Sequence, residues 1–114
     1  MIISKKTNNK GVEFPGLPLR TNAPITWCPG CPDFMIMEGE RRAFLSLIKK
    51  GLKKENLVLV AGIGCHGKIF DYMNISGFYG LHGRDIPAAI GIKIGNPNLE
   101  VVVNAGDGDT YSEG

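Results

Sequence analysis

Two short apolar segments, each followed at once by a glycine-rich turn, constrain the fold of this chain most. Residues 57–61 read Leu-Val-Leu-Val-Ala, and residues 99–105 contain three consecutive valines. Such uninterrupted apolar runs are typical of strands in a parallel sheet with both faces covered. A helical pattern over residues 34–50, with Asp33 as its expected cap, precedes the first strand, and a helix starting at Asp85 precedes the second. The sequence therefore predicts an α/β fold, a parallel sheet flanked by helices.

The two strand ends carry different chemical groups. Gly106-Asp107-Gly108-Asp109 follows the second strand with two carboxylates, which suit a Mg²⁺ ion that bridges to phosphates. Residues 62–68 follow the first strand and contain a thiol, an imidazole and an ammonium group. Ligands of open α/β sheets bind beyond the carboxyl ends of the strands, so we expect both turns at one mouth of the sheet. Taken alone, the glycine–aspartate turn is better explained as a solvated connection between two elements.

Composition and length narrow the class of protein. The chain has 114 residues, 43% apolar and 21% charged, which fits one globular domain at most. A net charge of +2 from scattered basic residues does not indicate nucleic-acid binding. The sequence has no apolar run of membrane-spanning length and no signal-peptide pattern. Three cysteines, an odd number, lie in glycine-rich motifs, so we expect a reducing, cytoplasmic setting rather than a disulfide framework.

The chain divides into two expected parts. Residues 1–26 are polar and then proline-punctuated, which predicts an extended arm on the surface or on a partner. Residues 27–114 hold the motifs, and they stop just after the aspartate turn. We therefore expect them to be the amino-terminal part of a longer, truncated domain. An irregular segment with a short strand or helix is expected over residues 69–83, with aromatic side chains that could wall a pocket. These aromatic residues are Phe70, Tyr72, Phe78 and Tyr79.

The Cys28-Pro29-Gly30-Cys31 motif allows three interpretations. It could be a thioredoxin-like redox dithiol, although the middle residues run Pro-Gly and no early strand precedes it. It could bind zinc, which would require a second cysteine pair. It could bind an iron–sulfur cluster, which requires four thiolates, whereas the pair and Cys65 supply only three. The spacing by itself does not choose among them.

The order of four motifs resembles a known family, the β subunits of 2-oxoacid:ferredoxin oxidoreductases, which use thiamine diphosphate. The first two motifs are Trp27-Cys28-Pro29-Gly30-Cys31 and Gly62-Ile63-Gly64-Cys65. The last two are Gly77-Phe78 through Leu81-His82-Gly83-Arg84, and Gly106-Asp107-Gly108-Asp109. The resemblance covers about residues 25–114 and implies an incomplete thiamine diphosphate-binding fold.

The resemblance also implies a role for each site residue. Cys28, Cys31 and Cys65 would be three ligands of a [4Fe–4S] cluster, and Asp107 would bind Mg²⁺. Thiamine diphosphate would be lined by residues of both turns and by a histidine near its diphosphate. These cofactor-binding residues would be Ile63, Gly64, Cys65, His66, His82, Gly106, Gly108 and Asp109. His66 departs from the small hydroxyl residue common at that position in the family.

The implied reaction is the oxidative decarboxylation of a 2-oxoacid to an acyl-coenzyme A, with electrons passed to ferredoxin. The Cys65-His66-Gly67 and Leu81-His82-Gly83-Arg84 motifs look most like those of family members that act on 2-oxoglutarate or related acids. Pyruvate and branched-chain oxoacids are the alternatives. The partners would be an α subunit, with γ and δ subunits as further candidates, and ferredoxin. The activating glutamate is expected on a partner subunit, so the chain alone is expected to be inactive. Two other hypotheses stay open: a redox or zinc module using Cys28 and Cys31, and a non-catalytic Mg²⁺–phosphate-binding domain.

Overall fold

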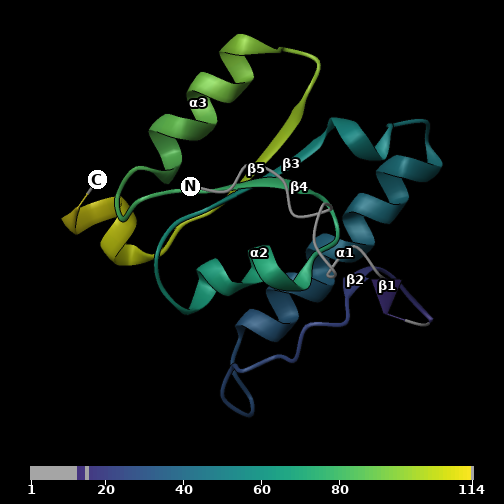
Figure 1. Cartoon of the computed structure of the whole chain (residues 1–114), viewed down its shortest axis with the longest axis horizontal. Coiled ribbons are helices and arrows are strands. Elements are labelled where there is room, and N and C mark those ends of the chain that lie inside the picture. Colours follow the sequence, from purple (N-terminus) through teal and green to yellow (C-terminus); the bar gives the residue numbers. More distant parts are fainter. Residues whose placement is uncertain (1–12, 15, 114) are drawn as a thin grey trace.

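The computed structural model describes residues 13, 14 and 16–113 (Figure 1). Its strands are β1 (Glu13–Phe14), β2 (Leu17–Thr21), β3 (Leu57–Ala61), β4 (Ser76–Tyr79) and β5 (Glu100–Asn104). Its α-helices are α1 (Asp33–Lys49), α2 (Ile69–Tyr72) and α3 (Asp85–Gly95). Short turns of other helix types are η2 (Lys54–Asn56), η3 (Cys65–Lys68) and the π-helical η4 (Gly108–Ser112).

The predicted parallel sheet is present and has three strands in the order β4-β3-β5. β3 lies in the centre and pairs in parallel with both neighbours, for example Val60 with Phe78 on one side and with Val103 on the other. Because all three strands run the same way, their carboxyl ends lie at one edge. The segment over residues 69–83, which was predicted to contain a short strand or helix, contains both α2 and β4.

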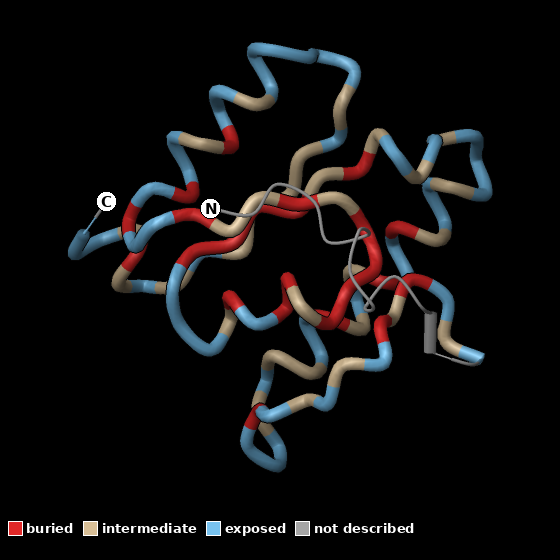
Figure 2. The backbone as a smooth tube through the Cα atoms, viewed as in Figure 1, coloured by how far each residue is buried: buried red, intermediate tan, exposed pale blue. Residues whose placement is uncertain are grey.

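Helices cover both faces of this sheet. α3 packs against β5 and β3 on one face, while α2 packs on the other, next to α1 (Figure 1). The core contains the fully buried Leu57 and Leu59 of β3 together with Met37 and Phe44 of α1. Buried residues concentrate along the central strand, and the outer side of α3 is exposed (Figure 2). This arrangement confirms the predicted α/β class.

Two local predictions are wrong. Asp33 is the first residue of α1 rather than its cap; Pro32 precedes it with no side-chain cap, and Asp33 instead accepts a 3.5 Å hydrogen bond from the Cys31 thiol. None of the four aromatic residues that were predicted to wall a pocket, Phe70, Tyr72, Phe78 and Tyr79, lines the pocket at this edge. Phe70 and Tyr72 are buried in the interior instead, because their helix packs against β3.

The described part of the amino-terminal segment contributes to the fold. β1 and β2 form an antiparallel hairpin, and Leu19 of β2 belongs to the core with 3% of its surface exposed. The carbonyl of Leu19 accepts a 2.7 Å hydrogen bond from the Asn74 amide. Residues 1–12 and 15 of the expected arm lie outside the described residues. Among those described, no helix combines the length and apolar character needed to cross a membrane.

Candidate functional site

A pocket of about 520 Å³ lies at the carboxyl edge of the sheet. Ligand pockets typically have volumes of roughly 300–1,000 Å³, so this one could hold a cofactor. Both glycine-rich turns line it, as the strand order requires. The predicted site residues in its wall are Ile63, Gly64, Cys65, His66, His82, Gly106, Asp107 and Gly108. Cys28, Cys31 and Asp109 are not in that wall.

The turn after β3 owes its shape to close backbone approaches. Gly62 donates a 3.3 Å hydrogen bond to the Asn104 carbonyl, which continues the pairing of β3 with β5. Gly64 then adopts a φ of +144°, a region that side chains disfavour, and the chain enters η3. A Cβ atom at Gly62 would overlap the carboxylate of Asp109. Glycine at position 62 therefore allows the two turns to meet.

Asp109 lies beneath the pocket wall, with only 1% of its surface exposed. Its carboxylate accepts hydrogen bonds from the amides of Gly83 at 3.0 Å, Gly106 at 3.3 Å and Ile63 at 3.4 Å. The imidazoles of His66 and His82 also contact it. Burial raises the pKa of Asp109, but the hydrogen bonds from the three amides and His66 outweigh this effect and hold the pKa well below its usual range. Asp109 is therefore a buried anion at the centre of the site.

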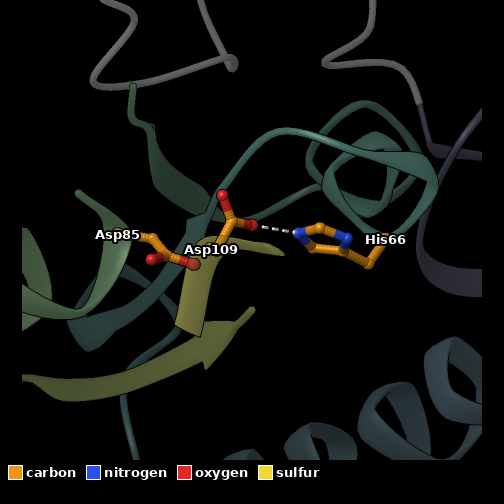
Figure 3. Close-up of side chains that lie close together, drawn as sticks. All are labelled: His66, Asp85 and Asp109. Carbon is orange, nitrogen blue, oxygen red and sulfur yellow. Dashed lines mark hydrogen bonds and ion pairs between the residues drawn. The ribbon is translucent and has the colours of Figure 1, made fainter. Parts of the chain in front are cut away.

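Asp85 places a second buried carboxylate near Asp109 (Figure 3). One ligand atom from each of His66, Asp85 and Asp109 lies within 4.8 Å of the others, and no other such group of three was found among the described residues. One oxygen of Asp85 accepts a 2.9 Å hydrogen bond from the Ile86 amide, while Oδ2 has no partner within the described residues. Two carboxylates and an imidazole are a donor set that suits divalent metals.

A hydrogen bond joins the two loops that carry the cysteines. The indole nitrogen of Trp27 donates to the carbonyl oxygen of Cys65 over 2.6 Å, and Trp27 directly precedes Cys28. Trp27 is 7% exposed, and its indole packs edge-on against Tyr72 and Phe34, so these contacts fix its position. Cys28 and Cys65 are exposed, and all three cysteines are free thiols. The Cys28–Cys31 turn therefore lies beside the Cys65 turn.

Sequence reasoning missed several wall residues. Trp27, Asp33, Ile36, Ile69, Asn104 and Ala105 also line the pocket. The position of Trp27 next to the cysteine pair was a visible signal, whereas Ile36 looked like an ordinary helix residue. Asp85 was predicted only as a helix start, and nothing in the sequence indicated that its carboxylate would be buried near Asp109.

Comparison with protein families and solved structures places this geometry in context. Residues 62–114 match the family model for the thiamine pyrophosphate enzyme, C-terminal TPP binding domain. A 2-oxoacid:ferredoxin oxidoreductase 2 subunit β from Aeropyrum pernix is 47% identical over 98 residues, which cover 86% of this chain and 31% of that protein. A 2-oxoacid:ferredoxin oxidoreductase subunit β from Saccharolobus solfataricus is 50% identical over 90 residues, which cover 77% of this chain and 28% of that protein.

A solved structure shares the fold as well as the sequence. It is a 2-oxoglutarate:ferredoxin oxidoreductase from Magnetococcus marinus with 2-oxoglutarate, coenzyme A and succinyl-CoA bound. The match has a TM-score of 0.77 and 36% sequence identity, and covers 84% of this chain and 32% of that one. The chain thus spans about a third of the length of the relatives it matches. Within that span, it belongs to the family of β subunits of 2-oxoacid:ferredoxin oxidoreductases.

Proposed function

We propose that this chain forms part of an enzyme that oxidatively decarboxylates a 2-oxoacid to an acyl-coenzyme A and reduces ferredoxin. The observation that carries the proposal is that the Cys65 turn after β3 and the Asp107 turn after β5 line the same pocket. A thiamine diphosphate enzyme that passes electrons to iron–sulfur carriers needs these groups near one another. When bound, thiamine diphosphate supplies an electron sink for loss of CO₂, and a [4Fe–4S] cluster takes up single electrons.

The pocket wall fits thiamine diphosphate. Gly64, Gly106 and Gly108 leave part of the wall without side chains, so a ligand can approach the backbone. Asp107 is exposed in this wall and would hold the Mg²⁺ that bridges to the diphosphate. His82 would contact the diphosphate end, while Ile63 and Cys65 would line the cofactor on the β3 side.

The cysteines fit a cluster better than an isolated dithiol. Trp27 holds the Cys28–Cys31 turn against the Cys65 backbone, so three thiols come from two adjacent loops. A thioredoxin-like or zinc module would use Cys28 and Cys31 alone and would not need Cys65. We propose that these three cysteines bind the cluster together with a fourth ligand from outside this chain's 114 residues.

The substrate and partners follow from the relatives. We propose 2-oxoglutarate as the favoured substrate because the structural relative contains it, with pyruvate and branched-chain oxoacids as alternatives. An α subunit would complete the site and supply the activating glutamate, with γ and δ subunits as further candidates. Ferredoxin would receive the electrons, and coenzyme A the acyl group.

The cysteine ligands can be tested by cluster content. We expect the subunit, prepared anaerobically with its partner subunits, to contain iron and sulfide and to absorb broadly in the visible range. Cys65→Ser should lose most of this iron. Unchanged metal content in Cys65→Ser, or a colourless protein that binds only zinc, would contradict the cluster and favour the dithiol or zinc module.

The cofactor assignment needs a separate measurement. Thiamine diphosphate with Mg²⁺ should raise the unfolding temperature of the same preparation more than Mg²⁺ with inorganic pyrophosphate does. Asp107→Asn should remove the Mg²⁺-dependent part of this increase. Equal protection by pyrophosphate would indicate a general Mg²⁺–phosphate-binding domain instead.

A further inference from the structure

Both histidines of the chain converge on one carboxylate. Nε2 of His66 lies 2.7 Å from Oδ2 of Asp109, and Nδ1 of His82 lies 2.5 Å from Oδ1. The two rings come from different loops, 16 positions apart in the sequence. Asp109 is therefore a shared anchor for the His66 and His82 loops.

The surroundings of Asp109 leave little freedom in how these contacts form. Three backbone amides already donate to its oxygens, and the carboxylate is buried. An ionised carboxylate only accepts hydrogen bonds. The hydrogen in each contact must therefore sit on the ring nitrogen, at Nε2 of His66 and at Nδ1 of His82.

The opposite edge of each ring lies next to glycines of the pocket wall. A Cβ atom added to Gly64 or Gly106 would come within 2.9 Å of Nδ1 of His66. A Cβ atom added to Gly108 would come within 3.3 Å of Nε2 of His82. Because these three positions are glycines, no side chain occupies the space beside the second nitrogen of either ring, and both histidines belong to the pocket wall.

We propose that Asp109 is a positioning residue that acts through the two histidines rather than by touching the cofactor. By binding Nε2 of His66, it leaves Nδ1 of that ring available to a ligand in the pocket. By binding Nδ1 of His82, it leaves Nε2 of that ring available in the same way. Each of these nitrogens accepts a hydrogen bond from the ligand when its ring is neutral and donates one when the ring is protonated. The identity of that ligand, thiamine diphosphate or the 2-oxoacid, rests on the proposed function, whereas the orientation of the rings does not.

The exposure of the three side chains favours this indirect role. Asp109 has no exposed side-chain surface, while the side chains of His66 and His82 are 18% and 43% exposed. Partners that orient a metal-ligating histidine typically contribute about 10- to 100-fold to metal affinity or activity, and we expect an effect of similar size here. Asp109 occupies such an orienting position for two rings at once.

The ring orientations can be tested directly by nitrogen NMR. The chain contains only two histidines, so ¹⁵N-histidine labelling of this chain alone, within its assembled enzyme, gives two imidazole spin systems. We expect the unmodified protein to keep a proton on Nε2 of His66 and on Nδ1 of His82. Protons on the opposite nitrogens of neutral rings would overturn the proposal without any variant being needed.

Two matched substitutions then distinguish the specific contact of Asp109 with the rings from the general loss of one negative charge in the site. Asp109→Asn keeps the shape of the side chain but replaces one acceptor by a donor, so at least one ring should lose its fixed tautomer. Measured without added cofactor or Mg²⁺, Asp107→Asn makes the same change two residues away, on a side chain with no hydrogen bond to either ring among the described residues, and should leave the proton position on both rings unchanged. Wild-type ring signals in Asp109→Asn would contradict the proposed anchoring.

Turnover and cofactor binding complete the test. In the assembled enzyme, Asp109→Asn should lower kcat by about 10- to 100-fold. The Kd of thiamine diphosphate should rise less than kcat falls, because under this proposal Asp109 affects the cofactor only through the histidine rings. A large rise in this Kd with wild-type ring tautomers would mean that Asp109 binds the cofactor itself. If thiamine diphosphate does not bind the unmodified enzyme at all, the proposed function fails while the tautomer result still stands.

Discussion

At the scale of single residues, Gly62 is a position in the site where a methyl group has no room. A Cβ atom there would overlap the Asp109 carboxylate, which five donors hold in place. We expect Gly62→Ala to lower the free energy of unfolding by about 1–3 kcal/mol, as overpacking typically does. Urea denaturation of both proteins measures the difference.

Gly91 provides the matched control for this substitution. It lies within α3, and a Cβ atom there would meet nothing within 4 Å in the described structure. Gly91→Ala should raise the free energy of unfolding by about 0.5–1 kcal/mol, because alanine favours the helix. Equal effects of the two substitutions would show that Asp109 is not held as rigidly as its hydrogen bonds indicate.

Trp27 makes one hydrogen bond that its neighbours cannot replace. In Trp27→Phe the aromatic contacts with Phe34 and Tyr72 can persist, but the donor to the Cys65 carbonyl is lost. We expect a loss of about 1 kcal/mol in the free energy of unfolding. Under the proposed function, iron content should fall further than this stability loss explains, because the two cysteine loops are no longer joined. Iron content equal to that of the unmodified protein would argue against this link.

At the scale of elements, Arg41 connects helix α1 to the amino-terminal hairpin, and Glu38 of the same helix holds the Arg41 side chain. The Glu38 carboxylate contacts Arg41 and Arg42 at 2.8 Å, and Arg41 also donates to the Pro18 carbonyl at 3.2 Å. Hydrogen bonds from Arg41 and then Arg42 lower the pKa of Glu38 to about 2. Glu38→Gln should therefore destabilise the protein at neutral pH, by less than about 1 kcal/mol since solvent screens the group.

The pH dependence of this effect has a definite sign. The folded-state pKa lies below the ordinary value of 4.5, so the stabilisation by Glu38 is complete above about pH 4.5 and is lost as the pH falls towards 2. Thermal unfolding of Glu38→Gln and the unmodified protein should therefore converge over this range. Arg42→Gln, at an arginine whose side chain is 76% exposed, should have a smaller effect than Arg41→Gln.

At the scale of the whole molecule, the pocket joins segments that are far apart in the sequence. Amides of Ile63, Gly83 and Gly106 all donate to Asp109, so they belong to one hydrogen-bonded unit. We expect thiamine diphosphate with Mg²⁺ to slow hydrogen exchange at these three amides together, while the exposed carboxyl-terminal turn of α3 stays unchanged. Protection confined to residues 104–109 would indicate that the ligand contacts the aspartate turn alone.

Much of this architecture could be read from the sequence. The strand over residues 57–61 was predicted with its observed bounds, and residues 99–105 contain the observed Glu100–Asn104. Apolar β-branched runs identify strands, but their burial depends on position in the sheet: the central strand β3 is buried, whereas the valines of the edge strand β5 are partly exposed. The family predicted from four ordered motifs is also confirmed, since such motifs reflect local backbone requirements that the sequence displays directly.

Tertiary contacts decided what the local sequence could not. Phe70 and Tyr72 are aromatic residues of the kind that line pockets, yet the packing of α2 on β3 places them in the interior. Asp107 and Asp109 are chemically identical and two residues apart, but one lines the pocket and the other is buried beneath two histidines. The sequence by itself determined which residues form strands, turns and motifs, because those depend on near neighbours. Only the folded structure decided which carboxylate faces a ligand, because that depends on donors contributed by three separate loops.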